Sequence, residues 1–221
     1  MSGDWVWSSR MSKSPATGRR MRRAAEPGGN IEQAVCDALE RLLATRKLAD
    51  LSVAEILREA GTSRGSFYFY FASKNAVLAA LAERVNDEVF EATQTWLHRD
   101  EGQPPEPALR AAMQGALALW RAHAPVIRAM VESWRSDPEL DAAWRRLIGR
   151  FTSSAAEQID RERAAGIAPP GPDSGALGAM LTWTTERCLY LAVSDGEPAF
   201  ADDEALVATL THVWWRAIYA R

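Results

Sequence analysis

Residues 61–74 read Gly-Thr-Ser-Arg-Gly-Ser-Phe-Tyr-Phe-Tyr-Phe-Ala-Ser-Lys, and they carry the most specific pattern in the sequence. Its aromatic residues cannot all belong to a core, because burying two tyrosine hydroxyls without partners is unfavourable. Phe67 and Phe71 are four residues apart and form the buried side of a short helix. The side chains left to face outward are Arg64, Gly65, Ser66, Tyr68 and Tyr70.

A second short helix precedes this one and is joined to it by a tight turn. Ser52 and Glu55 form a capping box that begins the first helix, and Gly61 supplies the positive-φ residue that ends it. Thr62 or Ser63 then caps the aromatic helix, whose free backbone amides favour a nearby phosphate. This order is the outline of a helix-turn-helix, whose second helix enters the DNA major groove.

Elsewhere apolar residues recur every three or four positions, which predicts further helices. One runs from Asn30 to about Arg46, and a long one from Lys74 to about His98 would span about 36 Å and connect the two ends of the protein. Five more follow, the first beginning at Pro107. The sequence therefore predicts an all-α fold of about nine helices. Its parts are a disordered basic arm (1–29), a helix-turn-helix domain (30–75) and a larger effector-binding and dimerisation domain (76–221).

The charge distribution suggests that a polyanion meets one end of the molecule. Residues 1–30 contain six of the 26 basic residues and two of the 29 acidic ones. The other 191 residues contain 20 basic and 27 acidic residues. A basic arm on an acidic body suits contact with DNA phosphates or a minor groove. A solvated tail explains the same arginines equally well.

Signatures of enzymes, metal sites and membrane spans are absent from the sequence. It has no glycine-rich phosphate loop, zinc-protease motif or nucleophile elbow, and its three histidines fall on separate segments. Cys36 and Cys188 lack redox or metal spacing, so we expect reduced thiols. No run approaches the ~18 apolar residues of a membrane span, and residues 1–30 lack a signal-peptide core. We expect a cytoplasmic protein that is not an enzyme and holds no cofactor or metal.

Tryptophans concentrate in the larger domain, where seven of the nine lie beyond residue 95. They are compatible with a core or a dimer seam, or with an apolar cavity between helices, and we favour the cavity because small residues stand beside them. These small residues are Gly115, Ala116, Gly149, Ala155 and Gly178. Polar contacts in such a cavity are expected from Thr182, Thr184 and Thr185.

The last two helices carry more apolar surface than one narrow stripe. Trp214 and Trp215 are adjacent and cannot share a face, so a monomer would leave one exposed. Burial against a twofold copy would give a four-helix dimer interface, and a dimer also suits paired DNA half-sites.

The stretch at 61–74 resembles the DNA-binding signature of the TetR family of transcriptional repressors. The family pattern is a glycine, a capping Ser or Thr, F/L-Y-x-H/Y-F and a lysine, and it stands here as Gly61, Ser63, Phe67, Tyr68, Tyr70, Phe71 and Lys74. The resemblance is strongest to the ethionamide-regulator type within that family. The segments that carry it are 48–78, 186–200 and 211–219.

This resemblance implies a homodimer in which each subunit places its recognition helix in a major groove. Arg64, Gly65 and Ser66 would face base edges, while Tyr68, Tyr70 and Lys74 hold phosphates. Ser52 and the capping residues Thr62 and Ser63 complete the DNA-binding set.

The resemblance also implies an apolar effector tunnel in the larger domain. The matching wall positions are Leu109, Ala116, Trp120, Ile148, Phe151, Ala155, Trp183, Thr185, Tyr190 and Trp214. Thr182 and Thr185 stand where that type offers asparagine amides, and Leu109 and Phe151 stand in place of tryptophans. A different effector is therefore expected.

Our first hypothesis is a ligand-responsive homodimeric repressor that binds operator DNA and is released by an apolar small molecule. The alternative is a small-molecule binding or carrier protein with a vestigial helix-turn-helix. An enzyme with an unrecognised site is the third.

Overall fold

The computed structural model describes residues 27–100, 102–194 and 196–220, and every regular element in these ranges is helical. This part of the chain contains nine α-helices, as predicted, and three 3-10 turns. The α-helices are α1 (Pro27–Leu43), α2 (Val53–Ala60), α3 (Arg64–Tyr70), α4 (Lys74–Leu97), α5 (Pro105–Ala122), α6 (Ala124–Ser133), α7 (Pro138–Ala164), α8 (Ser174–Val193) and α9 (Asp203–Tyr219). The turns are η1 (Leu48–Asp50), η2 (Trp134–Ser136) and η3 (Pro198–Phe200). Most of the expected basic arm lies outside the described residues.

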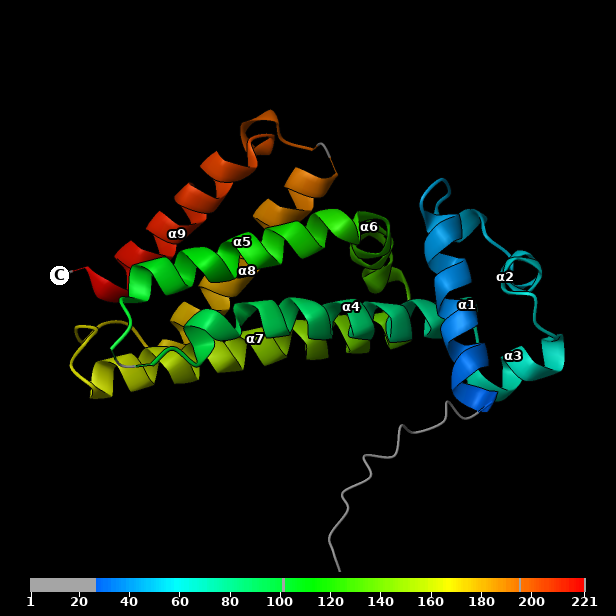
Figure 1. The fold of residues 1–221 in the computed structure, drawn as a ribbon, viewed down its shortest axis with the longest axis horizontal. Coiled ribbons are helices and arrows are strands. Elements are labelled where there is room, and N and C mark those ends of the chain that lie inside the picture. Colours follow the sequence, from blue (N-terminus) through cyan, green and yellow to red (C-terminus); the bar gives the residue numbers. More distant parts are fainter. Residues whose placement is uncertain (1–26, 101, 195, 221) are drawn as a thin grey trace, which may run out of the picture.

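The first three helices form a small unit at one end of the molecule (Figure 1). Its turns follow the local rules that the sequence suggested: Ser52 and Glu55 form the capping box, and Gly61 ends α2 at φ 63°. This left-handed region is open to glycine at little steric cost. Phe67 and Phe71 are both buried, and α3 packs on α1 and α2. The helix-turn-helix is thus confirmed.

α4 joins this unit to the larger domain. It has 24 residues, so it is about 36 Å long. Figure 1 shows α4 running from α1 to the far end of the molecule, near the C-terminal end of α9. There α4 packs against α5 and α7, α8 packs on α7, and α9 packs on α5. The short helix α6 lies at the junction, where it contacts both α1 and α4.

Two helices begin earlier than the sequence suggested. α1 starts at Pro27 instead of Asn30, and α5 starts at Pro105 instead of Pro107. The first backbone N–H groups of a helix have no partner within the helix, so proline loses nothing there by lacking its own. Each of these helices therefore begins at a proline that the sequence pattern had placed in the segment before it.

Two glycines that we expected beside a cavity instead allow helices to approach each other. A Cβ atom on Gly178 would lie 3.0 Å from the backbone carbonyl oxygen of Thr152, where α8 crosses α7. A Cβ atom on Gly115 would lie 3.0 Å from the Cβ of Ala92, where α5 crosses α4. Neither glycine lines the cavity described below, and Gly149 does not line it either, so this part of the expectation was wrong. The two alanines of the same set, Ala116 and Ala155, do line it.

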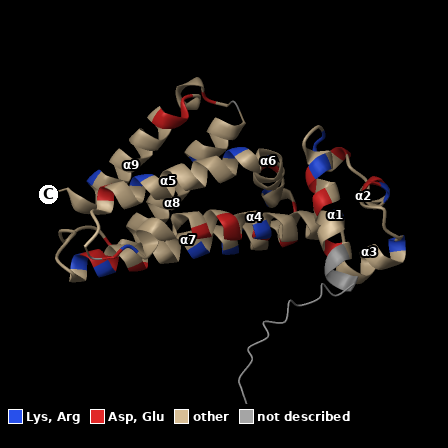
Figure 2. Cartoon of the chain, viewed as in Figure 1, with Lys and Arg blue, Asp and Glu red and all other residues tan. Residues whose placement is uncertain are grey.

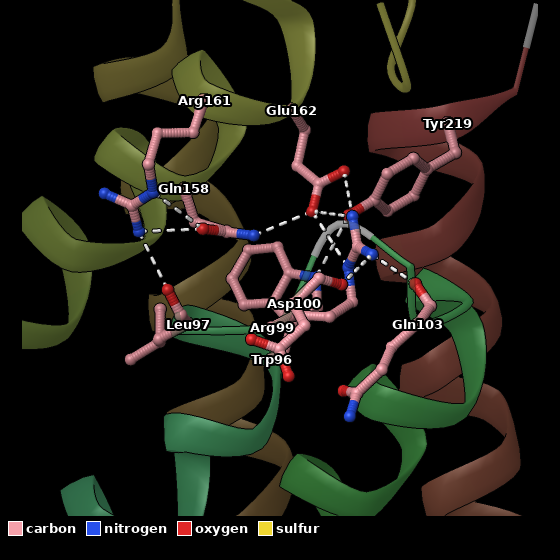
Figure 3. A network of polar contacts seen from close by, with 9 residues as sticks. All are labelled: Trp96, Leu97, Arg99, Asp100, Gln103, Gln158, Arg161, Glu162 and Tyr219. Carbon is pink, nitrogen blue, oxygen red and sulfur yellow. Dashed lines mark hydrogen bonds and ion pairs between the residues drawn. The ribbon is translucent and has the colours of Figure 1, made fainter. Parts of the chain in front are cut away.

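A buried polar network fastens the far end of α4 (Figure 3). Glu162 of α7 accepts hydrogen bonds from Arg99 Nη2 at 2.6 and 2.7 Å and from Gln158 Nε2 at 2.7 Å. The side chains of Arg99 and Glu162 are each only 2% exposed. Beside them the indole of Trp96 donates to the hydroxyl of Tyr219 at 3.0 Å, which ties α9 to the same point.

We predict that Glu162→Gln lowers the free energy of unfolding by about 3–5 kcal/mol, because it removes one charge of a buried ion pair. Urea denaturation followed by circular dichroism measures the change. The matched control is Glu83→Gln, which removes an exposed pair with Arg146 between the same two helices. Its cost should stay below about 1 kcal/mol. Equal losses in the two variants would contradict an anchoring role for the buried pair.

Candidate DNA-binding face and ligand cavity

The recognition helix α3 begins at a capping serine, and its first residues are exposed. Ser63 Oγ accepts from the backbone N–H of Ser66 at 3.0 Å and lies 2.9 Å from the Ser66 hydroxyl. Arg64, Gly65 and Tyr68 are exposed, and the Arg64 guanidinium lies 5.9 Å from the centre of the Tyr68 ring. The remaining predicted residues of the motif, Thr62, Ser66 and Tyr70, are half-buried, and Ser52 is exposed at its capping box. The structure thus gathers the predicted side chains at one end of the molecule.

Phe69 is a surface residue of α3 that sequence reasoning missed. It is 81% exposed, more than any other large apolar side chain in the described residues. Its ring meets that of Tyr70 edge-on, with centroids 4.9 Å apart. The signal was present in the spacing, because Phe69 lies four residues after Gly65 and therefore on the same helix face.

Lys74 differs from the picture of a free phosphate ligand. Its ammonium donates to the backbone carbonyls of Leu48 at 2.8 Å, Leu51 at 2.6 Å and Ala49 at 3.3 Å. An ammonium has three N–H donors, so these contacts occupy its bonding capacity. In this structure Lys74 fastens the start of α4 to the η1 turn before α2, and a phosphate would have to compete with those carbonyls.

The charge on α3 is entirely positive. Residues 61–74 contain Arg64 and Lys74 and no Asp or Glu, and Figure 2 shows a blue segment and no red one at the outer end of α3. The nearest capping carboxylate, Glu55, is held by the Arg46 guanidinium and by Ser52, which lower its pKa to about 2. This acid is therefore ionised and paired at neutral pH.

A cluster of charged side chains links α1 to the larger domain. Glu40 Oε1 lies 2.9 Å from His123 Nδ1, at the start of α6. Arg84 of α4 bonds to Asp37 and Glu40 of α1, each at 3.2 Å. Glu88 completes the cluster with an oxygen 3.4 Å from His123 Nε2. These side chains are 20–48% exposed, so the junction is wetter than the network at the far end.

The larger domain contains a mostly apolar cavity of about 110 Å³ that is lined by residues of α4, α5, α6, α7, α8 and α9. Eight of the ten predicted wall residues line it: Leu109, Ala116, Trp120, Ile148, Phe151, Ala155, Thr185 and Trp214. The expected Thr182 also borders the cavity, and Thr185 accepts a hydrogen bond from the indole of Trp214 at 2.9 Å. The sequence missed the whole contribution of α4, together with Trp144 and Glu186.

Trp183 and Tyr190 do not line the cavity, so these two predictions were wrong. Trp183 is 37% exposed on the outer side of α8, and the ring of Tyr190 lies 5.0 Å from the Arg187 guanidinium at the surface. Thr184, also expected to reach the cavity, is exposed. α8 is apolar around most of its circumference, so its sequence has no polar stripe from which the inward-facing side could be predicted.

The outer sides of α8 and α9 carry exposed apolar side chains. Met180 is 56% exposed. Together with Trp183 and Val213 it is one of the few large apolar side chains that are exposed among the described residues. Trp215 is half-buried and stacks on Tyr219 at 4.6 Å, whereas Trp214 is buried. Adjacent tryptophans therefore do face different ways, and the surplus apolar surface lies on both helices.

Other functional chemistry finds little support in the described residues. No group of His, Cys, Asp or Glu among them is placed to hold a metal ion. None of the described helices is both long and apolar enough to cross a membrane. Both cysteines are free thiols, and burial raises the pKa of Cys36 to about 11.

Comparison with known families divides the chain as the fold does. Residues 35–81 match the family described as "Bacterial regulatory proteins, tetR family", and residues 109–220 match "Transcriptional regulator EthR, C-terminal domain". The HTH-type transcriptional regulator EthR of Mycolicibacterium smegmatis is 35% identical over 203 residues, which cover 90% of this chain and 92% of that protein. EthR of Mycobacterium tuberculosis is 33% identical over 201 residues, which cover 90% and 93%.

Solved structures agree at the level of the fold. Salmonella enterica GusR superposes with a TM-score of 0.69 at 15% identity, over 88% of this chain and 98% of GusR. SmeT, the repressor of the Stenotrophomonas maltophilia multidrug efflux pump SmeDEF, superposes with a TM-score of 0.67 at 22% identity, over 84% and 89%. The sequence relatives are named as transcriptional regulators and not as enzymes. The chain is therefore a helix-turn-helix transcriptional regulator that belongs to the TetR family, with a C-terminal domain of the EthR type.

Proposed function

We propose that the protein is a cytoplasmic, homodimeric repressor that is released from operator DNA when an apolar small molecule enters the cavity. The observation that carries this proposal is that α4 belongs to both sites. Its first residue follows the recognition helix after a three-residue link, and its side chains between Ala82 and Leu97 form one wall of the cavity. A ligand that displaces α4 would therefore also displace α3.

On the DNA side, the exposed face of α3 fits direct contact with a major groove. Arg64 suits bidentate bonding to a guanine, Gly65 and Ser66 allow close approach to base edges, and the hydroxyls of Tyr68 and Tyr70 suit phosphates. Phe69 adds an apolar group of the kind that contacts thymine methyl groups. Lys74 supports this face indirectly, because its ammonium donates to the backbone carbonyls of Leu48, Ala49 and Leu51. It needs no phosphate contact for this role.

On the ligand side, release requires that the effector bind the DNA-free conformation more tightly than the DNA-bound one. A cavity bounded by side chains of α4 meets this requirement, because filling it favours arrangements in which α4 has moved outward. In a dimer the two recognition helices must match grooves about 34–36 Å apart, so a small tilt of each α4 is enough to lose one of them.

The dimer itself is best explained by the outer faces of α8 and α9. Exposed side chains such as Met180, Trp183 and Val213 are costly in water and gain free energy when a twofold copy covers them. Figure 1 shows α8 and α9 in the larger domain and α3 at the opposite end of the molecule, so dimer contacts there leave the DNA-binding face free.

We predict that Arg64→Ala weakens binding to the DNA upstream of the chain's own gene by about 1–3 kcal/mol, as loss of one base contact does. Mobility shift at fixed salt measures this, with Arg145→Ala, an exposed change on α7, as the matched control. The assignment of α3 is wrong if Arg64→Ala binds that DNA as tightly as the parent.

We predict that Lys74→Met lowers the free energy of unfolding, measured by urea denaturation, by about 1–3 kcal/mol, because three backbone carbonyls lose their hydrogen-bond donor.

We predict that Met180→Glu combined with Trp183→Glu converts the dimer to a monomer, because two charges would be buried at the centre of the interface. Sedimentation velocity measures the mass, and mobility shift should show weaker DNA binding. Ile167→Glu is the control, since Ile167 is an equally exposed apolar residue in the loop before α8. A doubly substituted protein that remains dimeric would place the interface elsewhere.

We predict that Ala116→Trp fills the cavity and prevents binding of an apolar probe while leaving DNA binding intact. Calorimetric titration with 1-octanol measures occupancy, and mobility shift at saturating 1-octanol measures release. The control is Ala118→Trp, an exposed position on the same helix. Undiminished release from Ala116→Trp would show that the probe acts elsewhere, and no release from the parent at saturation would contradict coupling between the cavity and α3.

A further inference from the structure

One carboxylate in the cavity wall lacks a partner that suits its burial. Glu186 of α8 is 4% exposed and borders the cavity. Its Oε1 accepts no hydrogen bond from any described residue. Its Oε2 lies 3.7 Å from Arg187 Nη2, which is beyond hydrogen-bond distance, and the Arg187 side chain is half exposed. Burial raises the pKa of Glu186, and the Arg187 charge only partly opposes this.

The same protein shows what a fully paired buried glutamate looks like. Glu162 is 2% exposed, and both its oxygens bond to Arg99 while Gln158 adds a further donor. Glu186 is almost as deeply buried and has none of these bonds. A carboxylate taken out of water without donors is unfavourable for folding, so the fold itself does not account for Glu186.

Two further polar atoms in the cavity wall are also unpaired within the described part of the chain. They are the amide nitrogen Nδ2 of Asn86, from α4, and the indole nitrogen Nε1 of Trp144, from α7. Together with Glu186 they place one strong acceptor and two N–H donors around a space that is otherwise mostly apolar. Buried polar groups are normally bonded, and three exceptions in one cavity indicate a polar ligand.

We propose that the effector is a lipophilic amine whose ammonium group donates to Oε1 of Glu186 while its hydrocarbon part fills the cavity between α4, α5 and α7. This inference rests on the effector cavity proposed above. An ammonium supplies both a hydrogen-bond donor and the missing positive charge, whereas a hydroxyl supplies the donor alone and a carboxylate is repelled. Asn86 and Trp144 remain available for an acceptor atom elsewhere on the same molecule.

Three probes of equal chain length test this inference: octylamine, 1-octanol and octanoate, each titrated into the full-length protein by calorimetry. We expect octylamine to bind at least about 10-fold more tightly than 1-octanol, the ratio given by one charge-assisted hydrogen bond, and octanoate to bind most weakly. Glu186→Gln should remove most of the preference for the amine and leave the affinity for 1-octanol unchanged. Arg187→Gln, which changes the neighbouring exposed charge, should keep the preference.

The melting temperature of Glu186→Gln provides a second measurement. It should equal or exceed that of the parent, because the variant removes a buried acid whose Oε1 has no hydrogen-bond donor among the described residues. A clear drop would show that the fold depends on this acid and would overturn the inference. Octylamine that fails to bind the parent, or binds no better than 1-octanol, would also overturn it.

Ala116→Trp separates this failure from failure of the proposed function. If the probes bind the parent equally and Ala116→Trp blocks them all, the cavity stands as the effector site and only the amine is wrong. If Ala116→Trp leaves their binding unchanged, the cavity is not the effector site and both proposals fail.

Discussion

The stiffness of α4 is the constraint on which the rest of the structure depends. An α-helix of 24 residues can tilt or shift but cannot easily change its length, so displacement of its middle must appear at its ends. Its first turn is tied by Lys74 to the carbonyls of Leu48 and Leu51, in the segment between α1 and α2. Just beyond its last turn, Arg99 pairs with Glu162. The cavity lies between these two fastenings, so one helix carries both the ligand wall and the support of the DNA-binding face.

The two ends of α4 are held with different strength, and this difference gives any movement a direction. At the far end the ion pair is almost completely buried, and separating such a pair is costly, so that end resists displacement. At the near end Glu40, Arg84 and His123 are partly exposed, and ion pairs of this kind contribute little and rearrange at low cost. Displacement of α4 by a ligand would therefore pivot about the far network and move α1 and α3, which is the response that a ligand-controlled DNA reader needs.

Features set by residues close in sequence could be predicted, and those set by distant pairs could not. The capping box of Ser52, the turn at Gly61 and the buried spacing of Phe67 depend on neighbours within four residues, so the helix-turn-helix was readable from the chain. The partners of Lys74 lie 23–26 residues away, and Glu162, the buried counter-charge of Arg99, lies 63 residues away, beyond any local pattern. Most of the cavity wall was anticipated through the family resemblance, but Trp183 was misplaced because α8 is apolar on nearly every side. The rotation of such a helix is decided by what packs around it.

Glu162 and Glu186 are two buried glutamates of the larger domain with different surroundings. Both are almost fully buried, yet one is surrounded by donors and the other faces a mostly apolar space. Local rules of folding agree at the first site and conflict at the second, and such conflicts are expected where a protein meets a ligand. The rigid frame makes the second site possible: helices that are fastened by the Arg99–Glu162 network and by close crossings at Gly115 and Gly178 cannot collapse to satisfy one carboxylate. The buried pair at the end of α4 thus keeps the unpaired acid in the cavity available to a ligand.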